Sequence, residues 1–387
     1  MRRRCGRVST GTWRIIASAS ICSVTPPDAV TAPVLSVDVG AVVANWRSLA
    51  ALHGGETAAV VKADAYGLGA ELIAPALARA GCQRFFVATA DEAIALRGVI
   101  AAPWIAVLNG CPAGCEGDFI GQALVPVLNS LADCARWQGA ARAAGRALPA
   151  LLHVDTGMSR LGLDAGEWAA VLRDRSCLNG IELQFVMSHL VSAEVADAPE
   201  TAAQVARFAA IAAAMPDVAT SLANSSGIFL GDTARSDLAR PGVALYGGNP
   251  VPGQPNPMRA VVTLAAPVLQ IRVIEPGETV GYNGTWRAAR RSRIATIGVG
   301  YADGLPRTLS NRLTARHDGR VVPLVGRVSM DLMTFDVTDL PDIVPGAMLD
   351  LIGPDHAVDD LAAEAGTIAY EILTSLGQRY RRVAKSV

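Results

Sequence analysis

Residues 57–69 read Thr-Ala-Ala-Val-Val-Lys-Ala-Asp-Ala-Tyr-Gly-Leu-Gly, and the organisation of the chain is first visible here. A short apolar run ends at Lys62, and an alanine-rich segment with helical character follows over 70–80. A wholly apolar run of this length is typical of a strand that is buried on both faces, as strands are in parallel sheets. The stretch therefore predicts one β-then-α unit with a charged side chain at the carboxyl end of its strand.

The same unit recurs along residues 33–250. Further apolar runs predict strands at 85–88, 104–108, 124–128, 150–154 and 181–187. Helices are predicted around these strands, at 42–52, 91–97, 130–145, 165–174 and 199–214. About eight such units favour an α/β fold whose N-terminal part is a (β/α)8 TIM-type barrel. A doubly wound open sheet is the alternative.

The pattern changes after Gly247, which indicates a second domain over 251–387. Residues 249–257 are too rich in Pro and Gly for a helix or a central strand, so they read as a linker. Beyond the linker, four segments predict strands, a turn signal at 317–320 predicts a hairpin, and one helix is predicted over 358–376. The four strand-rich segments are 261–274, 293–300, 320–337 and 347–352. The C-terminal domain is therefore expected to be mostly β.

The composition excludes several classes of protein. The chain has 387 residues, 51% of them apolar and 18% charged, with a net charge of −1. That charge content is too low for a disordered polyelectrolyte, and the charge balance argues against nucleic acid as a partner. No apolar stretch of the length needed for a transmembrane helix is present, so membrane partners are not expected. A small-molecule substrate is the expected partner.

The cysteines and the N-terminus indicate a cytoplasmic protein. Seven cysteines are scattered without a Cys-x-x-Cys motif, so a disulfide framework is not expected. Cys111 and Cys115 lack two further ligands at metal spacing, and no metal site is predicted. Residues 1–32 begin with three arginines and lack a clear signal-peptide pattern. They are interpreted as a disordered extension or a start site placed too far upstream.

Lys62 is the first candidate for chemistry. Only Lys62 and Lys385 are lysines, against 32 arginines, so solubility does not explain its side chain. An ammonium group beside an apolar strand loses hydration, which lowers its pKa and makes the neutral amine accessible. Amines of this kind form Schiff bases with carbonyl compounds. Taken alone, Lys62 could equally be a lysine whose charge reaches solvent from a strand end.

Val61-Lys-Ala-Asp-Ala-Tyr-Gly-Leu-Gly69 resembles the signature around the cofactor lysine of alanine racemases, which are pyridoxal-phosphate enzymes built on a barrel. Seven further segments are similar to signatures of that family and follow in the family's order. They are His153-Val-Asp-Thr-Gly-Met-Ser-Arg-Leu-Gly162, Met187-Ser-His-Leu190, Asn224-Ser-Ser-Gly227, Arg240-Pro-Gly-Val-Ala-Leu-Tyr-Gly247, Val280-Gly-Tyr-Asn-Gly-Thr-Trp286, Gly300-Tyr-Ala-Asp-Gly304 and Val325-Gly-Arg-Val-Ser-Met-Asp331. The resemblance extends over residues 33–382, and the order of the motifs makes it specific.

The resemblance implies a set of cofactor contacts for pyridoxal 5'-phosphate. Lys62 would hold the aldehyde, His189 would pack on the ring, and Arg240 would meet the ring nitrogen. The contacts expected on the phosphate side are Tyr66, Asn224, Ser225, Gly242 and Val243. An arginine has no acceptor capacity, so Arg240 favours an unprotonated ring, which suits return of a proton to Cα. Gln378 stands where the family commonly has a tyrosine, which leaves the contacts at 378–380 open.

The resemblance also implies two bases. Lys62 would stand on one face of the substrate, and Tyr282 on the other face, from the partner subunit of a homodimer with shared sites. Arg160 would bind the substrate carboxylate, and Tyr301 and Met330 would arrive from the partner, although ordinary packing is the alternative for these two. Cationic character at His189 and Arg240 is expected to lower the pKa of Tyr282. The implied reaction interconverts L-alanine and D-alanine, which supplies D-alanine for peptidoglycan.

His153 departs from the family pattern. Many members carry a lysine at this position, whose carbamate orients the substrate arginine. An imidazole cannot carry a stable carbamate, so Arg160 must be oriented by a bound anion such as chloride or by His153 itself. The departure affects substrate affinity and not the type of reaction.

Three alternatives remain at this point. A racemase of the same fold with serine or broader specificity differs only in the shape of its pocket. A non-catalytic pyridoxal-phosphate carrier would lack the second domain and Tyr282. A decarboxylase of barrel-plus-β architecture would normally have an acidic residue at the ring nitrogen, where this chain has Arg240.

Overall fold

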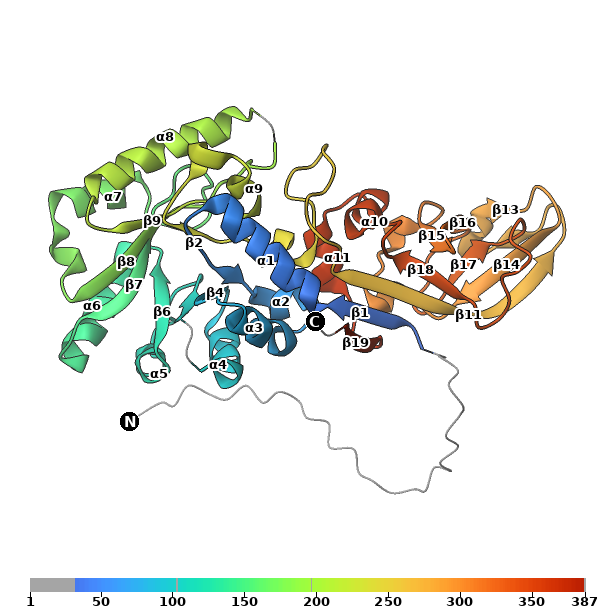
Figure 1. The fold of residues 1–387 in the computed structure, drawn as a ribbon, viewed down its shortest axis with the longest axis horizontal. Coiled ribbons are helices and arrows are strands. Elements are labelled where there is room, and N and C mark those ends of the chain that lie inside the picture. The colour runs from blue at the N-terminus through green and yellow to red at the C-terminus, as the bar shows by residue number, and fades with distance from the viewer. Residues whose placement is uncertain (1–31, 102–103, 196, 386–387) are drawn as a thin grey trace, which may run out of the picture.

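The computed structural model describes residues 32–101, 104–195 and 197–385. The molecule is elongated, with a helix-covered barrel at one end and a strand-rich domain at the other (Figure 1). Helix α1 and strand β1 lie where the two parts meet. The sequence-based interpretation of residues 1–32 falls almost wholly outside the described residues.

A parallel sheet forms the wall of the barrel, in the order β3-β4-β5-β6-β7-β8-β9. The strands are Ala59–Val60 (β3), Arg84–Val87 (β4), Trp104–Val107 (β5), Leu124–Leu128 (β6), Leu148–His153 (β7), Ile181–Met187 (β8) and Ala219–Ser221 (β9). Strand β10 (Leu238–Ala239) pairs in parallel with β2 (Glu56–Thr57), and the Arg240 N–H donates to Ala223 O beyond β9. Strand β10 therefore lies between the two ends of the sheet, and the predicted barrel is confirmed over the open sheet.

Helices cover the outside of the barrel, as Figure 1 shows. The helices of this part of the chain are α1 (Val39–His53), α2 (Lys62–Gly67), α3 (Ala70–Arg79), α4 (Ala90–Val99), α5 (Glu116–Gly121), α6 (Leu131–Ala144), α7 (Ala165–Arg173), α8 (Pro199–Ala214) and α9 (Ser225–Ile228), of which α2 and α9 lie at the cavity described below. Local sequence sets several of their ends. Thr89 and Glu92 form a capping box at the start of α4, and α6 begins at the Ser130 cap and ends at Gly145 in the left-handed region.

The C-terminal domain is built on a long strand, β11 (Val262–Ile274), which pairs with β14 and with β18. Its other strands are β12 (Thr279–Val280), β13 (Trp286–Arg287), β14 (Ser292–Ile297), β15 (Thr314–His317), β16 (Arg320–Pro323), β17 (Met333–Asp336), β18 (Met348–Ile352) and β19 (Arg381–Lys385). The first strand of the chain, β1 (Val34–Asp38), pairs with β11 and β19 and so belongs to this sheet. The expected mostly-β character and the hairpin at 317–320 are confirmed.

The single helix predicted over 358–376 is wrong. The structure has two helices there, α10 (Val358–Ala365) and α11 (Ala369–Ser375). Gly366 has φ = 74°, a left-handed conformation that ends the first helix and that glycine adopts without steric cost. The break turns α11 toward α2, which it contacts.

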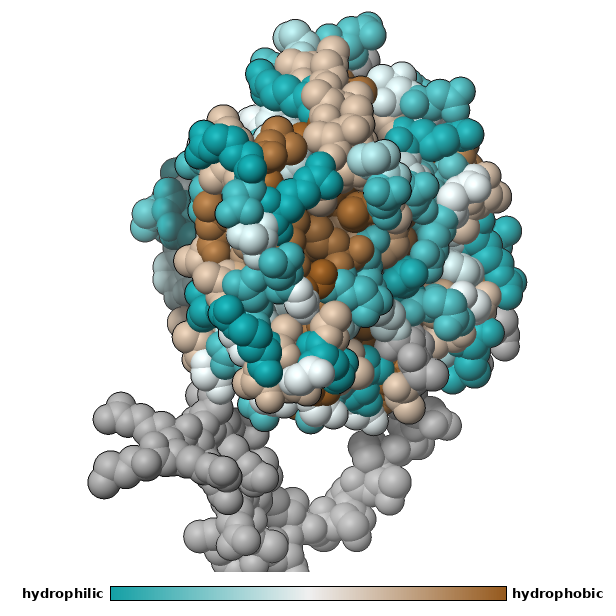
Figure 2. Space-filling view, turned by 90° about the vertical axis from the view of Figure 1, so that its left-hand side faces the viewer, coloured by the Kyte–Doolittle hydropathy of each residue, from teal (hydrophilic) through white to brown (hydrophobic). Residues whose placement is uncertain are grey.

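The barrel end of the molecule presents a mainly hydrophilic surface, with apolar residues gathered near the centre of that face (Figure 2). Beneath it, one large core contains the barrel strands and continues into the C-terminal sheet. Across the described parts of the chain, no helix is both long enough and apolar enough to cross a membrane.

Candidate active site

Lys62 follows β3 at the carboxyl end of the barrel strands, where the sequence predicts it. Helix α2, which begins at Lys62, is not an ordinary helix, because residues from Ala63 (φ = 51°) to Tyr66 (φ = 57°) have left-handed backbone angles. Left-handed conformation costs an L-residue with a side chain about 1–2 kcal/mol. Strain of this kind persists only where the surroundings impose it, and it is found most often at functional sites.

Two contacts hold this left-handed turn. The Glu92 carboxylate accepts from the Ala63 N–H at 2.8 Å and from the Ala88 N–H at 2.7 Å, so it joins the turn to the end of β4. Gly67 lies against Leu373 of α11, and a Cβ added at Gly67 would come within 2.6 Å of the Leu373 carbonyl oxygen. Glu92 is a site residue that sequence reasoning missed, because its capping-box position in α4 already accounts for an acidic side chain.

The Lys62 side chain lines a cavity of about 240 Å³. Its lining contains most of the residues expected to bind a cofactor or substrate, namely Lys62, Tyr66, Arg160, His189, Asn224, Ser225, Arg240 and Gly242. Burial lowers the pKa of Lys62, and Arg160 lowers it further, while Glu92 opposes them. The neutral amine is therefore more accessible than in an exposed lysine.

One side of this cavity is suited to a phosphate group. The Ser225 hydroxyl oxygen accepts from the Gly242 N–H at 2.9 Å and from the Ala244 N–H at 3.3 Å. The Tyr66 hydroxyl lies so close to Gly242 that a Cβ there would overlap it, so glycine is required at this position. Tyr66 stacks on Tyr246 with ring centroids 4.7 Å apart, and burial raises its pKa, so it stays a neutral donor.

Arg240 is 4% exposed and lies at the other side of the cavity. Its two terminal nitrogens donate to the Ser221 hydroxyl and the Ser188 carbonyl oxygen. Within the described residues it pairs with no carboxylate, and its Nε–H makes no hydrogen bond. Burial lowers its pKa to about 10, which still leaves it charged at neutral pH. A buried, unpaired guanidinium of this kind fits a ligand that offers an acceptor.

His189 lines the same cavity, and its charge differs from the expectation. Burial lowers its pKa to about 3, and Arg240, Arg160 and Lys62 contribute in the same direction. The imidazole is therefore neutral at pH 7. The expectation that a cationic His189 assists Tyr282 is wrong, since burial among cations opposes a second positive charge.

Arg160 lies on a tight loop beside the cavity. The Asp155 carboxylate closes the loop by accepting the N–H groups of Gly157, Met158 and Ser159 at 2.8–2.9 Å. The guanidinium is exposed and forms no ion pair with any described residue. It is available for an anionic group that enters the cavity.

The remaining predicted residues lie elsewhere on the same chain. Tyr282, on a short 3-10 helix between β12 and β13, is 65% exposed and lines a separate cavity of about 350 Å³ in the C-terminal domain. Figure 1 places that hairpin at the far end of the domain from α2. Tyr301 is 43% exposed and Met330 is 54% exposed. On a single chain, none of these three residues lines the Lys62 cavity.

The matches to known proteins cover both halves of the chain. Residues 37–250 match the family model for the N-terminal domain of alanine racemase, and residues 261–384 match the model for its C-terminal domain. The chain belongs to the alanine racemase family. It is therefore an alanine racemase in class, an isomerase.

Relatives within this family are close. An alanine racemase of Acidiphilium cryptum is 66% identical over 92% of this chain and 99% of its own length. A catabolic alanine racemase of Agrobacterium fabrum is 48% identical over 90% of this chain and 91% of its own. The crystal structure of Bartonella henselae alanine racemase with covalently bound pyridoxal phosphate is 42% identical, with a TM-score of 0.88, covering 92% of this chain and 99% of that one.

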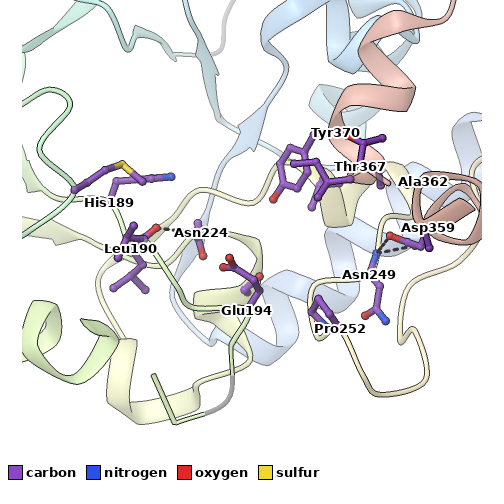
Figure 3. Close-up of a pocket in the computed structure, with 17 residues that line it drawn as sticks. His189, Leu190, Glu194, Asn224, Asn249, Pro252, Asp359, Ala362, Thr367 and Tyr370 are labelled. Atoms are coloured by element: carbon purple, nitrogen blue, oxygen red, sulfur yellow. Dashed lines mark hydrogen bonds between the residues drawn. The ribbon is translucent and has the colours of Figure 1, made fainter. Parts of the chain in front are cut away.

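Tyr370 is a second residue of the site that the motifs did not reveal. It lies on α11, with its ring centroid 5.9 Å from that of Tyr66, and lines the Lys62 cavity. It also lines an adjoining cavity of about 560 Å³, to which His189, Asn224 and Val243 contribute (Figure 3). Gln378, by contrast, is exposed, and Arg379 and Tyr380 bond to Asp303. Gly366, which ends α10 and lets α11 turn toward α2, is the feature of the sequence that could have indicated Tyr370.

Proposed function

We propose that this protein interconverts L-alanine and D-alanine with pyridoxal 5'-phosphate held at Lys62. The observation that carries the proposal is the composition of one cavity. It combines a lysine whose pKa is lowered by burial, a hydroxyl and amide cradle at Ser225, and a buried Arg240 without a carboxylate partner. In this order, the three groups match the aldehyde, the phosphate and the unprotonated ring nitrogen of pyridoxal phosphate.

The residues present fit this cofactor. Ser225 and the backbone near Gly242 and Val243 would hold the phosphate, with the Tyr66 hydroxyl beside them. The Arg240 Nε–H lacks a partner among the described residues and would donate to the ring nitrogen, while neutral His189 would pack on the ring. When bound, the cofactor supplies the electron withdrawal that makes the Cα proton of an amino acid removable.

The proton transfers fall to two side chains. The Lys62 amine, once free, exchanges a proton with Cα from one face, and its lowered pKa suits that role at neutral pH. The Tyr282 phenol does the same on the opposite face. Arg160 binds the substrate carboxylate and fixes Cα between the two bases.

Tyr282 reaches this site from a second copy of the chain, so the enzyme works as a homodimer with shared sites. The proposal is supported by the exposure of Tyr282, Tyr301 and Met330 on one chain, and by the separate cavities that Tyr282 and Lys62 line. Tyr301 and Met330 lie on two loops joined by backbone hydrogen bonds, from the Tyr301 N–H to Ser329 O and from the Ala302 N–H to Met330 O. The pair would enter the partner's site together and limit the space beside the substrate.

Arg240 disfavours one alternative, and the second domain disfavours another. A decarboxylase benefits from a protonated ring, which a permanent donor does not favour. A non-catalytic carrier has no use for the second domain that bears Tyr282. A racemase that also accepts serine remains a candidate, since the adjoining cavity of about 560 Å³ offers space beyond a methyl group.

We further propose separate roles for the two domains and a cytoplasmic location for the protein. Residues 33–250 bind the cofactor, and residues 251–387 complete the partner's site. The five described cysteines are free thiols, which suits the reducing cytoplasm. There the product D-alanine would supply peptidoglycan.

The direct test is formation of D-alanine from L-alanine by purified protein with added cofactor. L-serine, L-lysine and L-arginine are assayed beside it at equal concentration. We expect alanine to be racemised fastest. Release of carbon dioxide instead of a change of configuration, or no turnover of any of the four, would reject the proposal.

A further inference from the structure

A buried polar pair, Asn129 and His153, lies at the base of the Arg160 loop. The Asn129 Nδ2 donates to Leu108 O at 3.0 Å and to Val127 O at 3.2 Å. Its Oδ1 is therefore turned toward His153, whose Nδ1 lies 2.8 Å away. Because an amide oxygen only accepts, the His153 Nδ1 carries the proton, and Nε2 presents a lone pair.

The His153 imidazole is uncharged. Burial lowers its pKa to about 4, and Arg240 and Arg160 act in the same direction while Asp155 opposes them. The side chain is 9% exposed, and its Nε2 has no hydrogen-bond partner among the described residues. The Nε2 atom is also not fully buried, so a donor can reach it. His153 Nε2 is therefore a hydrogen-bond acceptor without a donor in the described parts of the chain, and the positive charges of Arg240 and Arg160 act on its ring.

The loop that carries Arg160 is fastened to His153 by both backbone and side chain. The Leu163 N–H donates to His153 O at 2.8 Å, and the Asp155 N–H donates to Leu163 O at 3.0 Å. Gly162 lies on the imidazole, since a Cβ added there would come within 3.1 Å of its Cγ and Cδ2. The ring is thus the surface on which the loop rests.

We infer that His153 is a positioning residue for Arg160, with Asn129 fixing its tautomer so that Nε2 accepts from the guanidinium when substrate is bound. This rests on the proposed function, in which Arg160 binds the substrate carboxylate. An uncharged acceptor orients the guanidinium without neutralising it, so the full positive charge remains for the substrate. Neither chloride nor a carbamate is then needed to orient Arg160.

The test uses the holoenzyme and two variants at one position. His153→Leu removes the acceptor, whereas His153→Gln keeps a side-chain oxygen that can accept. His53→Leu is the matched control, because His53 is a second buried histidine, 4% exposed, that does not line the site. Propionate, which is alanine without its amino group, is the probe. Its binding is measured by calorimetry, and KM and kcat are measured with both alanine enantiomers.

We expect His153→Leu to weaken propionate binding and to raise KM about 10–100-fold, as loss of a hydrogen bond to a charged group does. The change in kcat should be smaller, His153→Gln should recover part of the loss, and His53→Leu should leave KM unchanged. Replacing chloride by sulfate should not alter the wild-type KM.

Two results would overturn the inference: an unchanged propionate affinity in folded, cofactor-loaded His153→Leu, or a wild-type KM that rises when chloride is removed. If His153→Leu does not fold, the same comparison is made with His153→Gln, whose propionate affinity should fall below wild type. Failure of the proposed function looks different, because wild-type protein would then not racemise alanine at all.

Discussion

Two inactive variants should restore activity when they are mixed, if each site is built from two chains. Lys62→Ala removes one base and Tyr282→Phe removes the other. On a single chain these residues line different cavities, and Tyr282 is 65% exposed. In a hybrid dimer one site carries both lesions and the other carries neither.

The expected recovery follows from the geometry. With free exchange of equal amounts, up to half of the dimers become hybrids, and each hybrid has one intact site of two. Activity should therefore reach about a quarter of wild type. A substitution on the surface of the barrel helices, such as Arg142→Ala, serves as a control. This variant keeps both bases and is active by itself, so mixing it with either inactive variant lowers the activity per chain and restores none.

The assay follows D-alanine formation after the two variants are incubated under conditions that allow subunit exchange. Mass spectrometry of differently tagged chains measures how much hybrid has formed. If hybrids are present and activity stays absent, each site is built within one chain and the shared-site proposal is wrong. The arrangement of the Lys62 cavity would still stand.

Three further outcomes are expected. Borohydride reduction of the holoenzyme should fix the cofactor on the peptide that contains Lys62, and label on the Lys385 peptide would contradict the assignment. Tyr282→Phe should slow proton abstraction from L-alanine about 10²–10⁴-fold with little change in cofactor binding, whereas equal and mild losses in both directions would remove Tyr282 from the role. The cofactor-free protein should lose stability as pH falls from about 6.5 toward 4, since His153, with its pKa lowered to about 4, stays neutral in the native state while the unfolded chain takes up protons. Thermal unfolding of His153→Gln should show a weaker dependence over that range, and an unchanged slope would contradict the burial argument.

The barrel was predictable because its signal is local and repeated. Each strand is a short apolar run, and the helices between strands carry their own caps, as α4 does at Thr89 and α6 does at Ser130. The positions of Lys62 and His189 follow, because each lies two residues beyond the end of such a strand. A residue at the carboxyl end of a barrel strand has little freedom to be elsewhere.

The left-handed turn from Ala63 to Tyr66 was not predictable in the same way. Alanine favours the right-handed helix, and nothing in the local sequence opposes it. The turn depends on the Glu92 carboxylate at the Ala63 N–H and on the close approach of α11 at Gly67. Both are tertiary contacts between segments distant in sequence, so they become visible only in the folded chain.

The expectation of a cationic His189 was wrong for a related reason. The family resemblance implies that His189 and Arg240 lie near each other, which fits either a cationic histidine beside a ligand or a neutral one. Burial decides between them, and burial depends on how β8, β9 and β10 close around the site. The role of His189 on the cofactor ring stays a prediction.

One segment near the C-terminus joins each chain's own site to the loops it would lend to its partner. Arg382 donates to Gly67 O at 2.7 Å, at the end of the turn that begins with Lys62. Five residues before it, the Gly377 N–H donates to Asp303 O at 3.0 Å, and Arg379 pairs with the Asp303 carboxylate. Asp303 in turn accepts from the Gly300 N–H, beside Tyr301. If Tyr301 enters the partner's site, as proposed, this segment sets the distance between two groups of one chain. They are Lys62, which serves the chain's own site, and Tyr301, which serves the partner's site. Arg379 and Tyr380 both bond to Asp303 and so belong to this connection.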